Sequence, residues 1–135
     1  MGAGGMGGYI GGRLAQAGRN VTFITRGQHL RAIQNEGLRV QSPDGDLVLN
    51  PARSTDNPEE VGPVDLILLC VKSYDVLKAA EKPKPVLGPK TVIVPVQNGI
   101  ERIKKLGSIL GMEHVLGGAS LISAQIHAPG SVRHH

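Results

Sequence analysis

The chain has 135 residues, which leaves room for one domain of ordinary size but not for two. Its 40% apolar and 19% charged residues are typical of a folded, soluble protein and exclude a disordered one, and its longest apolar run, 66–71, is too short to cross a membrane. The net charge of +4 is scattered and aromatic residues are few, which argues against a nucleic-acid surface, and the start lacks a signal-peptide pattern, so we expect a cytoplasmic protein.

Hydrophobic periodicity and turn residues divide the chain into alternating helices and strands. In chain order the predicted elements are a helix at 4–17, a strand at 21–24, a helix at 28–36, a hairpin of strands 38–41 and 47–49, a loop at 51–63, a strand at 64–71, a helix at 76–81, a strand at 91–94, a helix at 99–110, a strand at 115–122 and a short strand at Val132 after the turn Pro129-Gly130. Gly18, Gly37 and Gly111 stand where the helices should end. The alternation predicts an α/β fold with a mostly parallel, doubly wound sheet, in which 64–71 is buried on both faces.

The segment Gly2-Ala3-Gly4-Gly5-Met6-Gly7 fits the glycine fingerprint of dinucleotide-binding folds. In that motif Gly2 would permit a tight turn, Gly4 would admit a pyrophosphate close to the backbone, and Gly7 would let the helix approach the sheet. The following helix would offer free N–H groups and the positive end of its dipole to the phosphates. The segment therefore predicts a dinucleotide site.

A dinucleotide-binding unit has a strand before the first glycine, and here only Met1 precedes Gly2. In the usual order that strand lies between the strands predicted at 21–24 and 64–71. We therefore expect an incomplete fold, produced either by a miscalled start or by a true truncation.

The end of the strand at 21–24 bears on the choice between NAD and NADP. The sequence there is Thr25-Arg26-Gly27, and no carboxylate occurs between Gly2 and Asn35. NAD enzymes place a carboxylate at this point, whereas a 2′-phosphate requires a cation. Arg26 therefore favours NADP, although a solvated surface arginine would look the same.

Four ordered motifs, namely the glycine segment with Gly8-Tyr9, Thr25-Arg26-Gly27, Val71-Lys72-Ser73-Tyr74-Asp75 and Gln97-Asn98-Gly99, together resemble the ketopantoate reductase family. The resemblance implies NADPH-dependent reduction of 2-dehydropantoate to pantoate, on the route to pantothenate and coenzyme A. It also implies a Rossmann-type NADP-binding domain, here 1–135 as a fragment, and a helical C-terminal domain for substrate and dimerisation that this chain lacks. The full-length protein would then be compatible with a homodimer.

The resemblance assigns cofactor binding to residues Gly2, Ala3, Gly4, Gly5, Met6, Gly7, Arg26, Lys72 and Asn98, and catalytic roles to Lys72 and Asn98. Both of the last two follow strands at the carboxyl edge of the sheet, where ligands of open α/β sheets bind. Lys72 could instead mark where the chain meets solvent, and Asn98-Gly99 could be only a turn. The histidines lack metal-ligand context, so no metal is expected, and Cys70 is interpreted as a core residue.

Two other functions remain open on these residues. The general acid that the resemblance expects from the C-terminal domain is missing, so the chain could be a non-catalytic nucleotide-binding module or a defective gene fragment. Alternatively, the protein could be a related dehydrogenase that acts on another 2-oxo acid, because nothing in this half of the family's pattern dictates the substrate's side chain.

Overall fold

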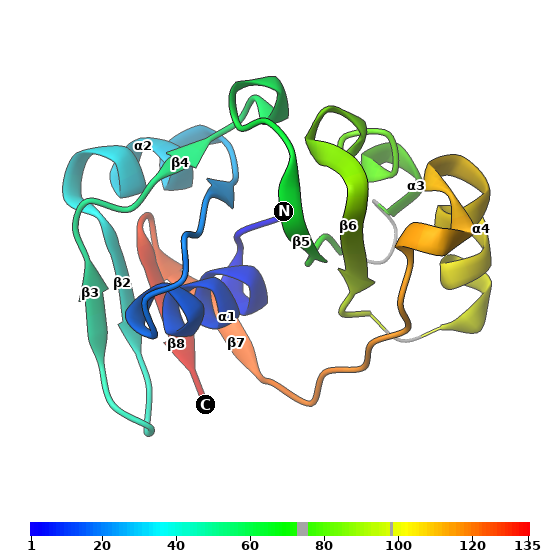
Figure 1. Ribbon diagram of the computed structural model, residues 1–135. Coiled ribbons are helices and arrows are strands. Elements are labelled where there is room, and N and C mark those ends of the chain that lie inside the picture. Colours follow the sequence, from blue (N-terminus) through cyan, green and yellow to red (C-terminus); the bar gives the residue numbers. More distant parts are fainter. Residues whose placement is uncertain (73–75, 98) are drawn as a thin grey trace. The chain divides into compact units, whose positions relative to one another are not determined.

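The computed structural model describes residues 1–72, 76–97 and 99–135 (Figure 1). The chain forms two compact units. The glycine-loop unit consists of residues 2–56 and 122–135. The β5–β6 unit consists of Met1 and residues 57–121, and we name it after its two strands.

The glycine-loop unit combines two helices with strands from both ends of the chain. Its elements are α1 (Gly5–Gln16), β1 (Phe23–Ile24), α2 (Gly27–Glu36), β2 (Leu38–Gln41), β3 (Leu47–Leu49), β4 (Ser54–Thr55), β7 (Ala124–Ala128) and β8 (Ser131–His134). Four strands form a sheet in the order β3-β2-β8-β7, in which β2 and β8 are parallel and the other two pairs antiparallel. The predicted hairpin and the predicted final strand after Pro129-Gly130 are therefore confirmed.

Helix α1 packs closely on the strands because glycines occupy its facing side. A Cβ atom on Gly8 would lie 2.9 Å from the Val132 side chain, and one on Gly11 would lie 2.6 Å from the Phe23 ring. The core beneath the helix contains Ala3, Phe23, Ile33, Leu38, Val40, Leu47 and Val132. The glycines therefore set the depth at which the start of α1 sits.

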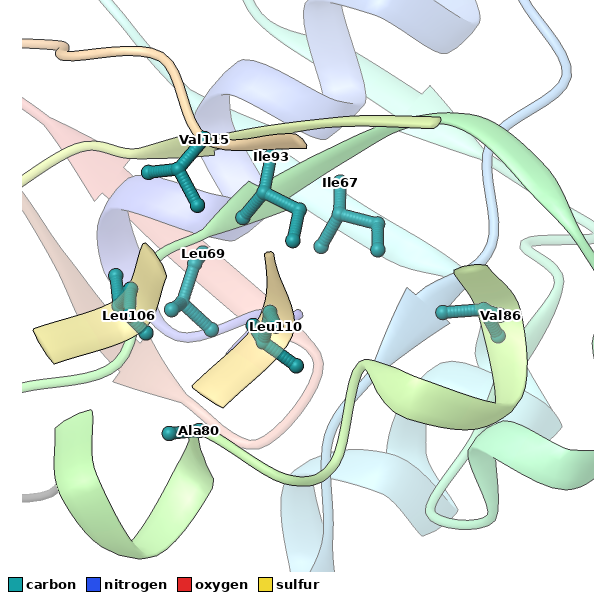
Figure 2. Packing of buried hydrophobic residues seen from close by; sticks show 8 residues of the cluster. All are labelled: Ile67, Leu69, Ala80, Val86, Ile93, Leu106, Leu110 and Val115. Carbon is teal, nitrogen blue, oxygen red and sulfur yellow. The ribbon is translucent and has the colours of Figure 1, made fainter. Parts of the chain in front are cut away.

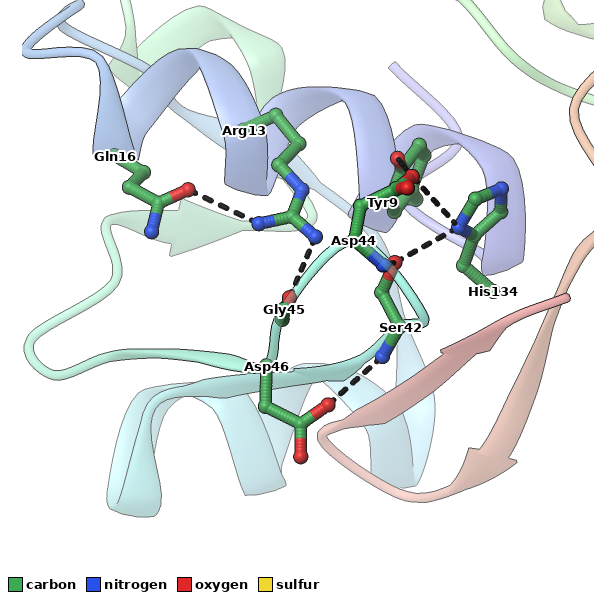
Figure 3. A network of polar contacts seen from close by, with 8 residues as sticks. All are labelled: Tyr9, Arg13, Gln16, Ser42, Asp44, Gly45, Asp46 and His134. Atoms are coloured by element: carbon green, nitrogen blue, oxygen red, sulfur yellow. Dashed lines mark hydrogen bonds and ion pairs between the residues drawn. The ribbon is translucent and has the colours of Figure 1, made fainter.

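Polar contacts also tie α1 to the turn of the β2–β3 hairpin (Figure 3). Arg13 Nη2 donates to the Gly45 carbonyl at 2.6 Å, and the Tyr9 hydroxyl donates to Asp44 at 3.2 Å. The His134 ring of β8 stacks on Tyr9 with 4.1 Å between ring centroids. Helix α1 is thus held by the hairpin turn and by β8.

The β5–β6 unit is built on two neighbouring parallel strands (Figure 1). Its elements are the short 3₁₀ helix η1 (Pro58–Glu60), β5 (Val64–Leu69), α3 (Val76–Ala79), the 3₁₀ helix η3 (Lys84–Val86), β6 (Leu87–Pro95), α4 (Ile100–Leu110) and the 3₁₀ helix η4 (Met112–His114). Met1 lies along the end of β5, where its amino group donates to the Leu68 carbonyl at 2.7 Å and its carbonyl accepts from Cys70 N at 2.8 Å. Met1 therefore makes hydrogen bonds of the kind that a neighbouring strand would make.

Helix α4 covers the two strands of this unit with its apolar side (Figure 2). Leu106 and Leu110 of α4 are buried together with Ile67 and Leu69 of β5 and Ile93 of β6. The apolar periodicity that predicted this helix is confirmed. Burial of side chains of this size contributes about 1.5–3 kcal/mol each, so this cluster is the main source of the unit's stability.

The strand predicted at 115–122 is wrong. Only Val115 pairs, as an isolated parallel bridge to Ile93, and regular strand structure begins at Ala124. A Cβ on Gly118 would lie 2.7 Å from the Val94 side chain, so the chain passes against β6 without a ladder. Glycine weakens a strand because it has no side chain to pack, and two glycines in a row, at 117 and 118, interrupt the apolar run.

The loop predicted at 51–63 is also partly wrong, because Ser54–Thr55 forms β4 and pairs in parallel with β1. This strand is short and polar, so it carries no hydrophobic signal. Burial on both faces of the strand predicted at 64–71 is wrong in its first half, where Leu66 is 47% exposed. Leu66 lies in register opposite Val92 on the face away from the buried Ile67 and Leu69, and that face is covered less completely.

The predicted helices are confirmed, and glycines end three of them. Gly18, Gly37 and Gly111 have φ of 84°, 84° and 98°, which only glycine adopts readily. The helix predicted at 76–81 is shorter, whereas the strand predicted at 91–94 extends to Leu87–Pro95. The α/β fold class is therefore confirmed. No helix among the described residues has the length and apolar character to span a membrane.

Candidate functional site

The glycine segment forms a tight loop at the end of β1. Gly2 has φ of 80°, and the amides of Gly2 and Ala3 both donate to the Ile24 carbonyl at 3.0 Å. The Gly4 amide then turns back to the Gly2 carbonyl at 2.8 Å. The predicted tight turn at Gly2 thus has the conformation that requires glycine.

Helix α1 begins immediately after this loop, so the positive end of its dipole lies beside the loop. Gly4 is the N-cap residue, and the first helical hydrogen bond runs from Gly8 N to the Gly4 carbonyl at 2.8 Å. The amides of Gly5, Met6 and Gly7 therefore have no acceptor within the helix. The first turn has no acidic side chain, so the dipole and these amides are available to an anion.

Side-chain packing does not account for glycine at position 4. Its φ of −80° lies outside the left-handed region, and a Cβ there would meet only Ile126 Cδ1, at an ordinary 3.9 Å. Packing therefore does not demand glycine at this position, but its ψ of −144° lies outside the ordinary α and β regions, which favours glycine.

Sequence reasoning missed the glycines that bring the helix to the sheet. It assigned that role to Gly7, but the buried glycines that contact strand residues are Gly8, Gly11 and Gly12. Their spacing of three and four residues places them on one face of a helix, and this spacing was the signal that could have found them.

Arg26 lies at the start of α2, two residues after the carbonyl that anchors the glycine loop. It is the N-cap of α2 in an extended conformation, with φ of −149° and ψ of 169°, and its side chain is exposed. It makes no ion pair with any residue in the described part of the chain. The glycine loop and an unpaired guanidinium thus belong to one unit and are joined through Ile24.

The other two predicted site residues lie in a different part of the chain. Lys72 is exposed and follows β5 in the β5–β6 unit, and Asn98 lies outside the described residues. Because β5 and β6 are parallel neighbours, with Leu69 opposite Pro95, the segments after both strands leave the same edge of the sheet. The structure brings together the glycine loop and Arg26, and it places Lys72 at the edge where Asn98 was predicted.

The buried His29 and the half-buried Cys70 lie near these segments and have shifted pKa values. Burial lowers the pKa of His29, the third residue of α2, and raises the pKa of the Cys70 thiol, which follows β5. Cys70 is therefore protonated at neutral pH and a poor nucleophile. No cluster of three or more metal-ligating side chains occurs among the residues that the structure describes.

The fold and the loop define a Rossmann-type α/β protein in which a glycine-rich loop leads into the start of α1. The sequence matches the family described as "Ketopantoate reductase PanE/ApbA" over residues 1–135. The chain belongs to this ketopantoate reductase family.

Named relatives agree with that assignment. The chain is 36% identical to a 2-dehydropantoate 2-reductase of Halobacterium salinarum, over 99% of this chain and 44% of that protein. The crystal structure of a 2-dehydropantoate 2-reductase from Porphyromonas gingivalis W83 is similar with a TM-score of 0.89 and 40% identity, over 99% of this chain and 49% of the other. A ternary structure of D-mandelate dehydrogenase with NADH and anilino(oxo)acetate is similar with a TM-score of 0.89 and 25% identity. The match covers 99% of this chain and 44% of that protein. The chain therefore spans about half the length of the proteins it matches.

Proposed function

We propose that this chain is the NADPH-binding part of a reductase that converts a 2-oxo acid to the 2-hydroxy acid, with 2-dehydropantoate as the substrate and pantoate as the product. The observation that carries the proposal is the combination, in one unit, of free amides at Gly5, Met6 and Gly7 with the exposed Arg26. The names of the relatives support the substrate. A cytoplasmic, homodimeric full-length enzyme with a further C-terminal domain belongs to the same proposal.

Each residue of the site has a distinct role in this proposal. The loop from Gly2 to Gly7 holds the pyrophosphate through backbone amides. The Arg26 guanidinium pairs with the 2′-phosphate, which a planar fork of donors can hold by two hydrogen bonds. No carboxylate precedes Asn35 in the sequence, so nothing in this segment repels that phosphate.

Bound NADPH supplies the hydride, and the chain's own residues hold and orient the reactants. The ammonium group of Lys72 attracts the carboxylate of a 2-oxo acid. The Asn98 amide orients the substrate carbonyl without changing its own charge near neutral pH. Such positioning accounts for much of the acceleration when two reactants must meet in a defined geometry.

The cofactor assignment is tested by calorimetric titration of the chain with NADPH and NADH. Replacing Arg26 with alanine should cost NADPH binding roughly 1.5–3 kcal/mol, the value of a hydrogen bond to a charged group, and leave NADH binding nearly unchanged. Arg31→Ala is the matched control, because it removes the same charge from an exposed position on α2. Equal affinity of the wild-type chain for the two nucleotides would contradict the NADP assignment.

The D-mandelate dehydrogenase similarity favours a second candidate, an NADH-dependent enzyme for another 2-oxo acid. The full-length protein should be assayed with NADPH and NADH against 2-dehydropantoate and against the 2-oxo acid that corresponds to mandelate. A kcat/KM that is highest for 2-dehydropantoate with NADPH supports the first proposal. Saturable nucleotide binding without any turnover would instead identify a non-catalytic nucleotide-binding module.

A further inference from the structure

A buried hydrogen bond joins helix α2 to the turn between β7 and β8. His29, in the first turn of α2, is only 8% exposed, and its Nδ1 atom accepts from the Gly130 amide at 3.0 Å. The two residues lie 101 positions apart, so this bond fastens a distant turn to the helix. An accepting ring nitrogen carries no proton, so the neutral ring has its proton on Nε2.

The turn at Gly130 has little freedom to move on α2. A Cβ on Gly130 would lie 3.0 Å from the Cβ of Ala32 and 3.4 Å from the Gly37 carbonyl oxygen. The Gly130 carbonyl accepts from Arg39 N at 2.9 Å, which ties the same residue to β2. The Gly130 N–H is therefore fixed in direction, and the carbonyl of this residue is already bonded elsewhere.

A protonated His29 ring does not fit this environment, because both ring nitrogens would then be donors. The Nδ1–H group would point at the Gly130 N–H, and Nε2 is buried without a hydrogen-bond partner among the described residues. The cation would thus have no acceptor in a site shielded from water, and an unpaired buried charge is strongly disfavoured. Burial accordingly lowers the pKa of His29.

Neighbouring charges do not offset this effect. Within the part of the chain that the structure describes, no ion pair joins His29 to an acidic side chain. Strand β4, which packs on α2, has no titratable residue. The charged and titratable side chains on the other elements around the ring and its turn are Arg26, Arg31 and Glu36 on α2, Arg39 on β2, His127 on β7, and Arg133 and His134 on β8. His127 is bonded to Arg133, and His134 to Ser42.

We infer that His29 is a pH-sensitive switch, which fastens the β7–β8 turn to α2 while the ring is neutral and releases the turn when the ring binds a proton. The inference does not depend on nucleotide binding. In the released state the ring reaches water and titrates near its ordinary value of 6.5, whereas the closed state resists the proton. The turn therefore opens more easily as the pH falls from 6.5 toward the pKa of the closed state, by at most about tenfold per pH unit, the limit for one proton.

Native-state hydrogen exchange of the wild-type chain, followed by NMR between about pH 7.5 and pH 5.5, tests the switch. After correction for the intrinsic pH dependence of exchange, the opening constant of the Gly130 amide should rise below pH 6.5. The Phe23 amide, which bonds to the Arg53 carbonyl in the same unit, should change by less than about twofold. A pH-independent opening constant at Gly130 would overturn the inference. An equal rise at Phe23 would also overturn it, because the whole unit would then be unfolding.

Two variants assign the pH dependence to this ring. His29→Asn keeps an acceptor near the position of Nδ1 but does not titrate, so the Gly130 amide should stay protected at every pH. His127→Asn is the matched control, because it removes an exposed histidine from the same hairpin, and it should keep the wild-type pH dependence. The opposite result for either variant would overturn the inference.

The protonation state of the wild-type ring gives a check that needs no variant. Nitrogen-15 spectra should show the tautomer with the proton on Nε2 near neutral pH, and a ring that titrates below the ordinary value of 6.5. A proton on Nδ1 would overturn the inference, because that nitrogen could not accept from Gly130. Titration at or above 6.5 would overturn it as well, because the closed turn would then not resist the proton.

Discussion

Gly4 and Gly5 are adjacent, yet the structure gives a packing reason for glycine at only one of them. A Cβ on Gly5 would collide with the backbone of Ala124 in β7, and no rotamer change can relieve a clash with backbone. A Cβ on Gly4 would make one ordinary contact with Ile126. Glycine at position 4 is therefore not explained by packing, although its ψ of −144° lies outside the ordinary α and β regions and favours glycine.

This difference predicts different outcomes for two alanine substitutions. Gly4→Ala should cost only the strain of its backbone conformation, on the order of 1 kcal/mol, and should weaken NADPH binding at least about tenfold, or about 1.4 kcal/mol, if the methyl group blocks the phosphate. Gly5→Ala should destabilise the chain by about 1–3 kcal/mol through overpacking. Thermal denaturation and calorimetry measure both effects. Normal NADPH affinity in folded Gly4→Ala would show that no phosphate approaches this position.

Cys70 should make stability depend on alkaline pH. Burial raises the pKa of its thiol in the folded state above the ordinary value of 9.0. Above pH 9.0 the unfolded chain loses this proton while the folded chain keeps it, so stability falls as the pH rises from 9.0 toward the folded-state pKa. Urea unfolding between pH 7 and 11 should show a steeper loss in the wild type than in Cys70→Ala. Parallel curves would contradict this assignment.

At the level of elements, the sequence predicted helix ends, which depend on local backbone conformation, better than strands, which depend on pairing with distant segments. The ends of helices at Gly18 and Gly37 depend on one residue's φ, so the pattern located them. Strand β4 was not predictable, because Ser54 and Thr55 pair only when β1 is already beside them. The start of β7 at Ala124 depends in the same way on its pairing with β8.

The same division holds for the candidate site. The tight turn at Gly2 was predictable because it depends on a short, contiguous glycine motif, whereas cofactor binding by this motif and by Arg26 stays a prediction. The hydrogen bond between His29 and Gly130 was not predictable, because the two residues lie 101 positions apart in the chain. Side chains that act through distant backbone groups leave no local pattern in the sequence.

Two glycines that end helices provide a matched test of how much a left-handed φ and a close backbone contact each contribute to stability. Gly18 and Gly37 both have φ of 84°, but a Cβ on Gly18 meets nothing within 4 Å, whereas one on Gly37 would collide with the Leu49 carbonyl. Gly18→Ala should therefore cost only the left-handed conformation, about 1–2 kcal/mol. Gly37→Ala should cost at least about twice as much, because overpacking adds to it. Urea unfolding measures both, and equal costs would contradict the role of the Leu49 contact.

At the scale of the whole chain, two hydrophobic clusters stabilise the two units. The cluster around Leu106 and Ile93 draws its buried residues from the β5–β6 unit, and the cluster around Ile33 and Val132 draws them from the glycine-loop unit. The two clusters share no residue. Proteins often open in such contiguous parts, with free energies that differ from one part to another.

We therefore expect a core mutation to affect mainly the unit that contains it. Leu106→Ala should cost about 2–5 kcal/mol in the β5–β6 unit, because it removes a fully buried side chain. Native-state hydrogen exchange should then show lost protection in β5 and β6, while amides of β2 and β8 exchange nearly as in the wild type. Ile33→Ala is the matched control and should reverse this pattern, because Ile33 is equally buried in the glycine-loop unit. Equal loss of protection in both units from either substitution would mean that the chain opens as a single cooperative body, in which case the fold of the glycine loop depends on the packing under α4.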